Sequence, residues 1–503
     1  MKKIILTGLI AFSVMPAVMA EDLYSQLRLV DPVMQNVLNL SPAEPPKRVS
    51  ISYDSPFALY NLAFERFKHS NVKPAYDDIK NLIENADAGD YFYIKVADNL
   101  AKAGLYSLSE LAMNKIKEKD ISNIVVEDIK HYYFPAKSIK QKKELYLGEI
   151  YSNIVYNDQM AEAFEELSNF NDTSGEGEDY VNYLKAFALV RSKDFTRAQE
   201  FIKKAVELNP DNINYQALEV EILAETNNPK EALKIINKLK KQQIYSVTYT
   251  EKINSLDEYV QYKLAKKDTV KNYHLGYYYY WEKAYEKSIR TLSGINKKDA
   301  KILSLLSRVY FDNKEYDKAY GFAMKSKNLA LSNEVLGDYF VESEDYHKAV
   351  KSYSKAVKLD EKQLRYKEKL AQCYFELDEY SKAKELFEQV IMTSSNAYIS
   401  YYNLAKLDST KELPYLKKSV AINMMFTDSW LALADCEMRK QNFQGADKYL
   451  KIVKSIDENN FKYYYYLGLL LDKQGQSEQA KQNYQKSLLL KPDFRPAKEA
   501  LNI

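Results

Sequence analysis

The chain has 503 residues, with 72 lysines and arginines against 70 aspartates and glutamates and a formal net charge of +2. Hydrophobic residues make up 46% and charged residues 28%, a composition that excludes wholesale disorder and a multi-span membrane protein. The 2 cysteines exclude a disulfide-dense scaffold, and the 13 glycines and 13 prolines favour long helices over strand-and-turn architectures.

Residues 1–20 have the pattern of a secretory signal peptide. Lys2 and Lys3 precede an apolar run that ends in small residues at Ala17 and Ala20, just before Glu21. We therefore expect export by a Sec-type signal to a bacterial periplasm or cell envelope, or secretion. Loss of the two lysines changes the net charge from +2 to 0, which disfavours nucleic acid as the main partner. No later stretch has the apolar length of a transmembrane span, so none is expected after cleavage.

Residues 21–55 precede the main body of the chain. A helix-like stretch at about 22–40 is followed by a linker that contains Pro42, Pro45 and Pro46. Because a residue before proline is pushed out of the α region, this linker is predicted to be extended.

From residue 56 to the C-terminus, apolar and small residues recur about every 34 positions. The pattern is clearest in the last third, at Tyr464, Leu467, Gly468, Ala480 and Tyr484; at Trp430, Leu433, Ala434, Ala446 and Leu450; at Leu370, Ala371, Ala383 and Phe387; and at Leu336, Gly337, Ala349 and Tyr353. Large apolar residues at this spacing form one stripe on a first helix, and Gly or Ala beside the Leu lets a second helix approach closely, as at Gly148, Gly276, Gly337 and Gly468. One such hairpin cannot bury its apolar face alone, so it needs neighbours on both sides.

This spacing resembles the tetratricopeptide repeat, whose pattern covers 34 residues. The resemblance implies an all-α protein, a right-handed α-solenoid of about 12–13 helical hairpins. The units that align begin near residues 56, 90, 141, 179, 212, 269, 300, 330, 364 and 398, with two more around Trp430 and Tyr464. Helical spacers are expected near 120–140 and 240–268, and a loop at Asp172–Glu178.

The predicted organisation therefore has five parts. They are a signal peptide at 1–20, an N-terminal helix and linker at 21–55, degenerate repeats at 56–172, repeats with a helical spacer at 179–268, and a C-terminal repeat array at 269–503.

The residue types that carry catalysis do not form recognisable constellations. His69, His131, His274 and His347 lie far apart, and none has a metal-binding spacing. No nucleophile motif is present, and the carboxylates alternate with lysines as solvated helix partners. We expect no enzyme activity, no cofactor and no metal. Cys373 and Cys436 fall at the same repeat position two units apart, which predicts two free, buried thiols.

The resemblance also implies which residues would bind a partner, because in the family positions 2, 5, 9, 12 and 13 of each unit face a concave groove. Transferred to this chain, these positions are Tyr180, Tyr183, Phe187 and Arg191; Tyr273, Tyr277, Tyr280 and Trp281; and the carboxylates Glu334, Asp338, Glu342, Glu368 and Glu376. Tyrosine and tryptophan are common interface anchors, and an acidic segment beside them favours a basic or mixed-charge ligand. Tyrosine also replaces core residues at Tyr279, Tyr310 and Tyr374, so the 44 tyrosines divide between core and groove.

The sequence thus predicts a non-catalytic scaffold of the bacterial cell envelope that binds a peptide or protein in its groove and could associate with envelope complexes. Two alternatives remain. One is an accessory role in envelope polysaccharide or protein secretion and assembly, since sugars stack on Tyr and Trp. The other is a cryptic enzyme, which would require His or carboxylate groups to converge in the groove.

Overall fold

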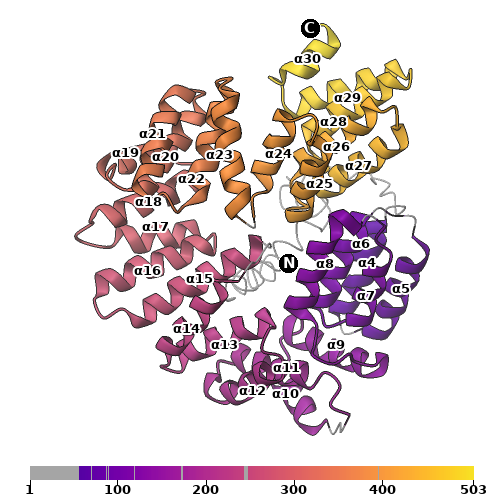
Figure 1. Cartoon of the computed structure of the whole chain (residues 1–503). Coiled ribbons are helices and arrows are strands. Elements are labelled where there is room, and N and C mark those ends of the chain that lie inside the picture. Colours follow the sequence, from indigo (N-terminus) through magenta and orange to yellow (C-terminus); the bar gives the residue numbers. More distant parts are fainter. Residues whose placement is uncertain are drawn as a thin grey trace, which may run out of the picture.

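A computed structural model describes residues 56–503, apart from positions 70, 87, 89, 118, 171–173, 243–246 and 395. The predicted signal peptide and the segment 21–55 lie outside the described residues. Within the described part, the chain forms 27 α-helices, labelled α4 to α30, and no β-strand (Figure 1).

Twenty-four of these helices form twelve hairpins of sequential helices that pack on each other. The hairpins are α4 (Pro56–Lys68) with α5 (Val72–Asn85), α6 (Asp90–Lys102) with α7 (Tyr106–Asn114), α9 (Gln141–Val155) with α10 (Met160–Asn169), α11 (Glu178–Arg191) with α12 (Phe195–Leu208), α13 (Ile213–Glu225) with α14 (Pro229–Leu239), and α16 (Asp268–Trp281) with α17 (Tyr285–Ser293). They continue with α18 (Ala300–Asp312) and α19 (Tyr316–Lys325), α20 (Ala330–Glu342) and α21 (Tyr346–Leu359), α22 (Leu364–Glu376) and α23 (Tyr380–Thr393), α24 (Tyr398–Leu407) and α25 (Glu412–Ile422), α26 (Thr427–Arg439) and α27 (Phe443–Ile456), and α28 (Phe461–Lys473) and α29 (Ser477–Leu490). The prediction of an all-α solenoid of about twelve hairpins is confirmed.

Three helices stand outside the hairpins. They are α8 (Lys119–Tyr133), α15 (Val247–Leu264) and the C-terminal α30 (Arg495–Leu501). The first two occupy the predicted spacers near 120–140 and 240–268. α15 packs mainly on α16 and α14, whereas α8 packs on α6 and on helices further along the chain.

The turns inside the hairpins share one backbone conformation. In ten of the twelve hairpins the connection contains a residue with positive φ, such as Lys283 at 56°, Asp378 at 58° and Gly475 at 77°. A single left-handed residue ends the first helix and reverses the chain within a few residues, so that the second helix packs back on the first.

Glycine beside leucine permits close contact inside three hairpins. A Cβ added at Gly276, Gly337 or Gly468 would lie 2.4–2.5 Å from the side chain of Leu292, Tyr353 or Tyr484 on the following helix. This is the role predicted for these glycines. Gly148 differs, because its nearest neighbours, Leu105 at 3.0 Å and Phe67 at 3.5 Å, come from earlier hairpins rather than from α10.

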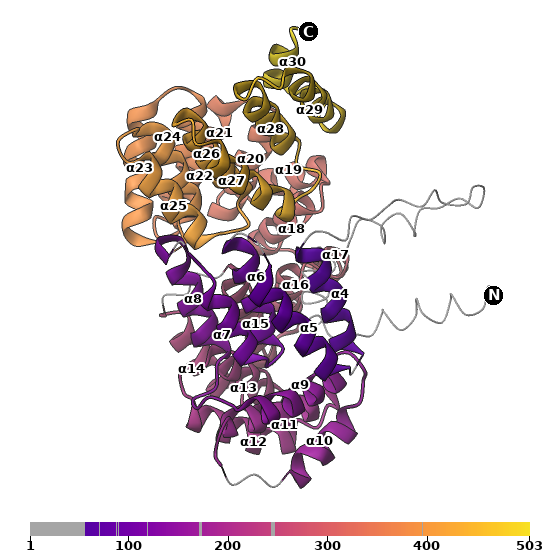
Figure 2. The same ribbon diagram turned by 90° about the vertical axis from the view of Figure 1, so that its right-hand side faces the viewer.

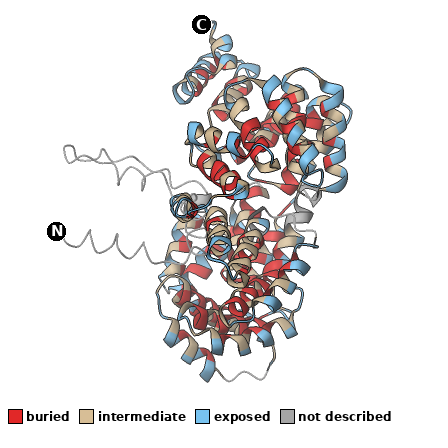
Figure 3. Cartoon of the chain, turned by 90° about the vertical axis from the view of Figure 1, so that its left-hand side faces the viewer, coloured by how far each residue is buried: buried red, intermediate tan, exposed pale blue. Residues whose placement is uncertain are grey.

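The array curves until its start meets α25. Figure 1 shows the hairpins arranged around a ring, with α25 next to α8, and Figure 2 shows the same neighbours from the side, with α28 to α30 extending beyond them. Buried residues lie between the helices, while exposed residues follow their outer sides (Figure 3).

One core cluster joins the first part of the array to α24–α28, since it includes residues from Tyr60 to Val260 and again from Ala405 to Leu470. The intervening arc has three smaller core clusters, which begin at Leu292, Ala349 and Ala371.

Candidate binding surface on the concave side

The structure brings the four aromatic residues predicted on α16 into contact. Tyr277 stacks on Trp281 with ring centroids 6.0 Å apart and an interplanar angle of 12°. Tyr273 lies 6.1 Å from Tyr277, and Tyr280 lies 5.8 Å from Tyr277 and 5.4 Å from Trp281. All four side chains are partly exposed. We call Tyr273, Tyr277, Tyr280 and Trp281 the aromatic cluster.

Helical spacing and anchoring explain why these rings converge. Positions i, i+4, i+7 and i+8 share one face of a helix, so the residues lie on one side of α16. The Tyr280 hydroxyl donates a hydrogen bond to Asp312 Oδ2 at 2.9 Å on α18. Burial raises the pKa of Tyr277 to about 12, and the positive charge of Arg365 opposes part of this rise. Tyr277 is therefore a neutral phenol at physiological pH.

Direct contacts link the aromatic cluster to the first helices of the following hairpins. Tyr280 bonds to Asp312 on α18, and Arg308 on α18 bonds to Asp338 on α20. The repeat positions predict that this row of first helices faces the concave side, and that assignment stays a prediction.

A second group of side chains, the charge cluster, continues from the aromatic cluster along α18, α20 and α22. It comprises Arg308, Asp312, Glu334, Asp338, Arg365 and Lys369. Lys369 Nζ lies 2.9 Å from Glu334 Oε1 and 2.7 Å from Asp338 Oδ1, and Arg365 Nη2 lies 2.9 Å from Glu334 Oε2. Arg308 bonds to Asp338 and Asp312.

These ion pairs correct the prediction of an acidic groove. Glu334 is 2% exposed, and its charge is matched by Arg365 and Lys369. Burial raises the pKa of Asp338, but Lys369 and Arg308 outweigh burial and hold it below its usual value. Three cations face three anions, so the charge cluster is balanced and offers no excess negative charge to a basic ligand.

The remaining predicted carboxylates, Glu342, Glu368 and Glu376, lie outside the charge cluster. Glu368 Oε1 accepts hydrogen bonds from Ser400 N at 3.0 Å and Ser400 Oγ at 2.6 Å, in the first turn of α24. An anion at this position satisfies helix N-terminal donors, which is a structural role. Glu342 and Glu376 lie at the C-terminal ends of α20 and α22, and both are at least partly exposed.

The predicted site on α11 is filled by the chain itself. Tyr180 and Tyr183 are 3% and 8% exposed, so their assignment to an open groove needs correction. Tyr106 lies edge-on to Tyr180 with ring centroids 5.2 Å apart. The backbone that follows α8 also crosses this region, where Ala136 N donates to Asp179 Oδ2 at 2.8 Å. Tyr106 on α7 and the segment after α8 thus cover this part of α11.

Phe187 and Arg191 remain partly exposed at the end of α11. Phe187 stacks on Tyr183 with a centroid separation of 5.8 Å, and Arg191 lies 3.9 Å from Asp158. These contacts place Phe187 beside its own helix and Arg191 beside the preceding hairpin.

Sequence reasoning missed Arg308, Asp312, Arg365 and Lys369. Three of them occupy the positions that were transferred in other units: Arg308 and Asp312 are positions 9 and 13 of the unit at 300, and Arg365 is position 2 of the unit at 364. Applying the same positions to every unit would have shown cations opposite the carboxylates. Lys369 lies outside those positions and carried no such signal.

Other candidate groups show no catalytic or metal arrangement in the described residues. No set of three or more His, Cys, Asp or Glu side chains there could hold a metal ion. His274 Nδ1 instead lies 2.7 Å from Glu258 Oε2. Cys373 and Cys436 are free and buried, as predicted.

An open pocket of about 340 Å³ between α5 and α9 involves none of the predicted site residues. None of the helices described between residues 56 and 503 combines the length and apolar character that a membrane span requires.

Family models match three parts of the chain. Residues 189–243 and 340–407 match one tetratricopeptide repeat model, and residues 461–494 match another. These three segments have the sequence pattern of tetratricopeptide repeats. The matched ranges fall mainly within α11–α14, α20–α24 and α28–α29. No curated protein matches the chain.

Several solved structures resemble parts of it. One is PilW, a widely conserved type IV pilus biogenesis factor, at 16% identity over 41% of this chain and 99% of that chain, with a TM-score of 0.35. Another is the APC/C hetero-tetramer Cut9-Hcn1, at 15% identity over 93% of this chain and 80% of that chain, with a TM-score of 0.30. A third is a thermophilic tetratricopeptide repeat protein from Thermus thermophilus, at 16% identity over 35% of this chain and 100% of that chain, with a TM-score of 0.31. At these identities and TM-scores the similarity says nothing about a binding partner, so we infer the chemistry of the partner from the surface of this chain.

Proposed function

We propose that the protein is a non-catalytic interaction scaffold that binds a peptide or protein partner at the aromatic cluster of its concave side. The observation that carries the proposal is the contiguity of four partly exposed rings on α16. Rigid aromatic side chains supply large contact area at small entropic cost, and they dominate interface energetics.

The balanced charge cluster bears on the chemistry of this partner. Because Arg308, Arg365 and Lys369 already pair with Asp312, Glu334 and Asp338, the surface beside the aromatic cluster has alternating rather than uniform charge. A partner with apolar or aromatic anchors and mixed polar flanks fits such a surface better than a strongly basic one.

The proposed cellular site rests on the N-terminal sequence pattern alone. We propose that residues 1–20 direct export and that the mature scaffold works in the bacterial envelope, within or beside envelope complexes. Intact mass measurement of the protein recovered from cells tests this, because removal of the signal predicts a chain that begins at Glu21. Recovery of the full-length chain from the cytoplasm would contradict it.

Co-purification from envelope extracts tests the binding site. We expect a combined Tyr273→Ala, Tyr277→Ala, Trp281→Ala variant to lose proteins that the wild type retains. Tyr380→Ala is the matched control, because Tyr380 is 47% exposed on α23, outside the cluster. Circular dichroism of each variant separates loss of binding from loss of fold. An unchanged partner set in the triple variant would refute the proposed site.

An accessory role in polysaccharide assembly uses the same rings. Sugars stack on flat aromatic faces, and the partly exposed Tyr277 and Trp281 rings lie nearly parallel. Polysaccharide retained by the wild type and released by the triple variant would favour this role over protein binding.

A further inference from the structure

One tertiary contact joins parts of the chain that are not neighbours in the array. In a linear repeat array each hairpin contacts only the hairpins beside it. Here α8, near the start of the described chain, also packs on α25. Figures 1 and 2 both show these helices side by side.

The burial pattern of α25 reflects this second contact. Most second helices bury one stripe, as α21 does with Ala349, Tyr353 and Ala356. In α25, Ser419, Val420, Ala421 and Ile422 are all buried. Four consecutive residues span about 300° of a helix, so α25 is covered on more than one side.

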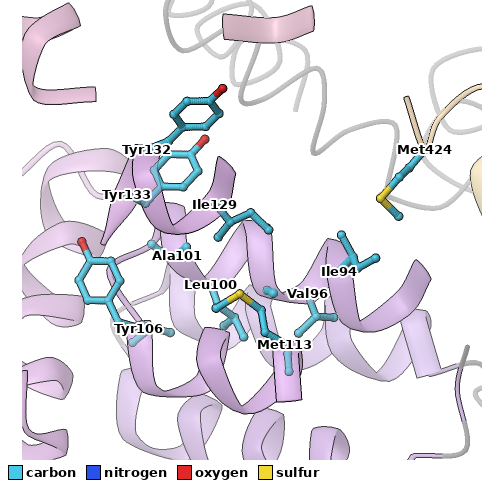
Figure 4. Packing of buried hydrophobic residues seen from close by; sticks show 14 of the residues in the cluster. Ile94, Val96, Leu100, Ala101, Tyr106, Met113, Ile129, Tyr132, Tyr133 and Met424 are labelled. Atoms are coloured by element: carbon cyan, nitrogen blue, oxygen red, sulfur yellow. The ribbon is translucent and has the colours of Figure 1, made fainter. Parts of the chain in front are cut away.

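The loop after α25 extends the contact. Met424 is 7% exposed, and Figure 4 shows its side chain directed toward Ile94 on α6, which is 2% exposed. The Tyr91 hydroxyl donates to Met425 Sδ at 3.2 Å, across 334 positions of sequence. Methionine packs adaptably on varied surfaces and has a polarizable sulfur. We call the contact of α8, Tyr91 and Ile94 with α25, Met424 and Met425 the closing contact.

We propose that the closing contact is a reversible latch, at which the ring opens and closes while every hairpin stays folded. The two sides of the latch are far apart in the sequence. α8 belongs to no hairpin and α25 pairs with α24, so separating α8 from α25 breaks no hairpin. The remaining arc, α16 to α24, is divided among three small core clusters, which allow small rotations between hairpins to add up.

Opening would also change access to the concave side. If the aromatic cluster lies on the inner side of the curve, as the repeat positions predict, a folded partner reaches it more readily when the ring is open. This consequence rests on the proposed function, whereas the latch itself does not.

Small-angle scattering of the full mature chain tests the latch. Met424→Glu places a carboxylate against the apolar Ile94 and should increase the radius of gyration and the maximum dimension, with helix content unchanged by circular dichroism. Met392→Glu is the matched control, because Met392 is 84% exposed on α23, and it should leave the scattering unchanged. An unchanged profile for Met424→Glu, or a loss of helix content beyond the control, would overturn the proposal.

Thiol labelling provides a second test in a closed ring. A Met424→Cys chain carries the native Cys436 of the large core cluster as an internal reference, since the two positions are 7% and 4% exposed. If the latch opens, the thiol introduced at position 424 should react with a thiol reagent about tenfold or more faster than Cys436, once each rate is divided by the rate in the urea-unfolded chain, because a local opening precedes global unfolding. Equal rates at the two sites would show that the contact opens only when the fold does.

The two proposals fail separately. A ring that opens in scattering while the triple aromatic variant keeps its partners would refute the binding site and leave the latch standing. A ring that never opens while the triple variant loses its partners would do the reverse.

Discussion

At the residue scale, contacts and ion pairs decide which of the tyrosines and carboxylates are accessible to a partner. Tyr180 and Tyr277 were both assigned to the groove from their repeat positions, yet Tyr180 is buried beneath Tyr106 and Tyr277 is partly exposed. Glu334 likewise occupies a groove position but is enclosed by cations. Repeat position thus identifies the side of a helix, while the neighbours determine what remains exposed.

Gly337 offers a direct test of helix contact. An alanine Cβ there would lie 2.4 Å from the Tyr353 ring, so Gly337→Ala should destabilise the protein by about 1–3 kcal/mol despite alanine's better helix propensity. Gly321 in α19 has nothing within 4 Å of the added Cβ, and Gly321→Ala should stabilise by about 0.5–1 kcal/mol. Urea unfolding followed by circular dichroism measures both. Similar shifts in the two variants would contradict the packing interpretation.

The charge cluster predicts an asymmetry between two glutamates. Glu334→Gln leaves Arg365 and Lys369 without their carboxylate, and should lower stability by about 1–3 kcal/mol, less than for a fully buried pair because these partners are 39% and 29% exposed. Glu342→Gln, at a more open position on the same helix, should change stability by less than about 0.5 kcal/mol. Thermal or urea unfolding measures the stability of both variants. Equal changes in stability would mean that the ion pairs of Glu334 with Arg365 and Lys369 do not stabilise the fold.

At the element scale, the hairpin is the unit that the sequence pattern describes. The helices α4, α6, α9, α18, α20, α22 and α24 begin at the predicted unit starts, and α11, α13 and α16 begin within one residue of them. The starts were predictable because the apolar stripe, small residues and turns recur locally. The packing of the spacer α8 was not predictable, because two of its partners, α13 and α25, lie far along the chain.

The first turn of α7 is coupled to pH through Glu144 on α9. This carboxylate accepts hydrogen bonds from Ser107 N, at 2.7 Å, and from Ser107 Oγ. Burial raises the pKa of Glu144 from 4.5 to about 7, against the opposing effect of the Ser107 hydrogen bonds. Between these values the folded state keeps a proton that the unfolded state has released. The contribution of Glu144 to stability therefore falls as pH rises from about 4.5 to about 7.

Glu144→Gln should remove this part of the pH dependence. We expect the difference in stability between wild type and Glu144→Gln to change across that window, whereas Glu149→Gln, at an exposed position of α9, should follow the wild type. Thermal melts at several pH values measure the effect. A constant difference between wild type and Glu144→Gln would contradict the raised pKa.

At the scale of the whole molecule, the array has an uneven core. The largest cluster spans the first part of the array, α24–α28 and the closing contact, while the arc from α16 to α24 has three smaller ones. Stability in repeat arrays is distributed among hairpins and their interfaces, so a divided core should lose structure first.

The two tryptophans report on these regions separately. Trp281 lies on α16 in the arc, and Trp430 is 3% exposed in the large cluster on α26. In Trp430→Phe and Trp281→Phe chains, each with one remaining tryptophan, we expect the fluorescence of Trp281 to change at a lower urea concentration than that of Trp430. Coincident midpoints would indicate one cooperative unit.

The sequence by itself determined the helical class, the hairpin register, the two spacers and the face of α16 that carries the aromatic cluster. These properties depend on residues within one or two repeats, where periodicity and turn chemistry act locally. Only the tertiary structure decided that Tyr180 and Tyr183 are covered, that Glu334 and Asp338 are neutralised, and that Tyr91 meets Met425. Those outcomes depend on contacts between neighbouring repeats or across the whole ring, and no 34-residue period encodes which distant surfaces meet when the array curves.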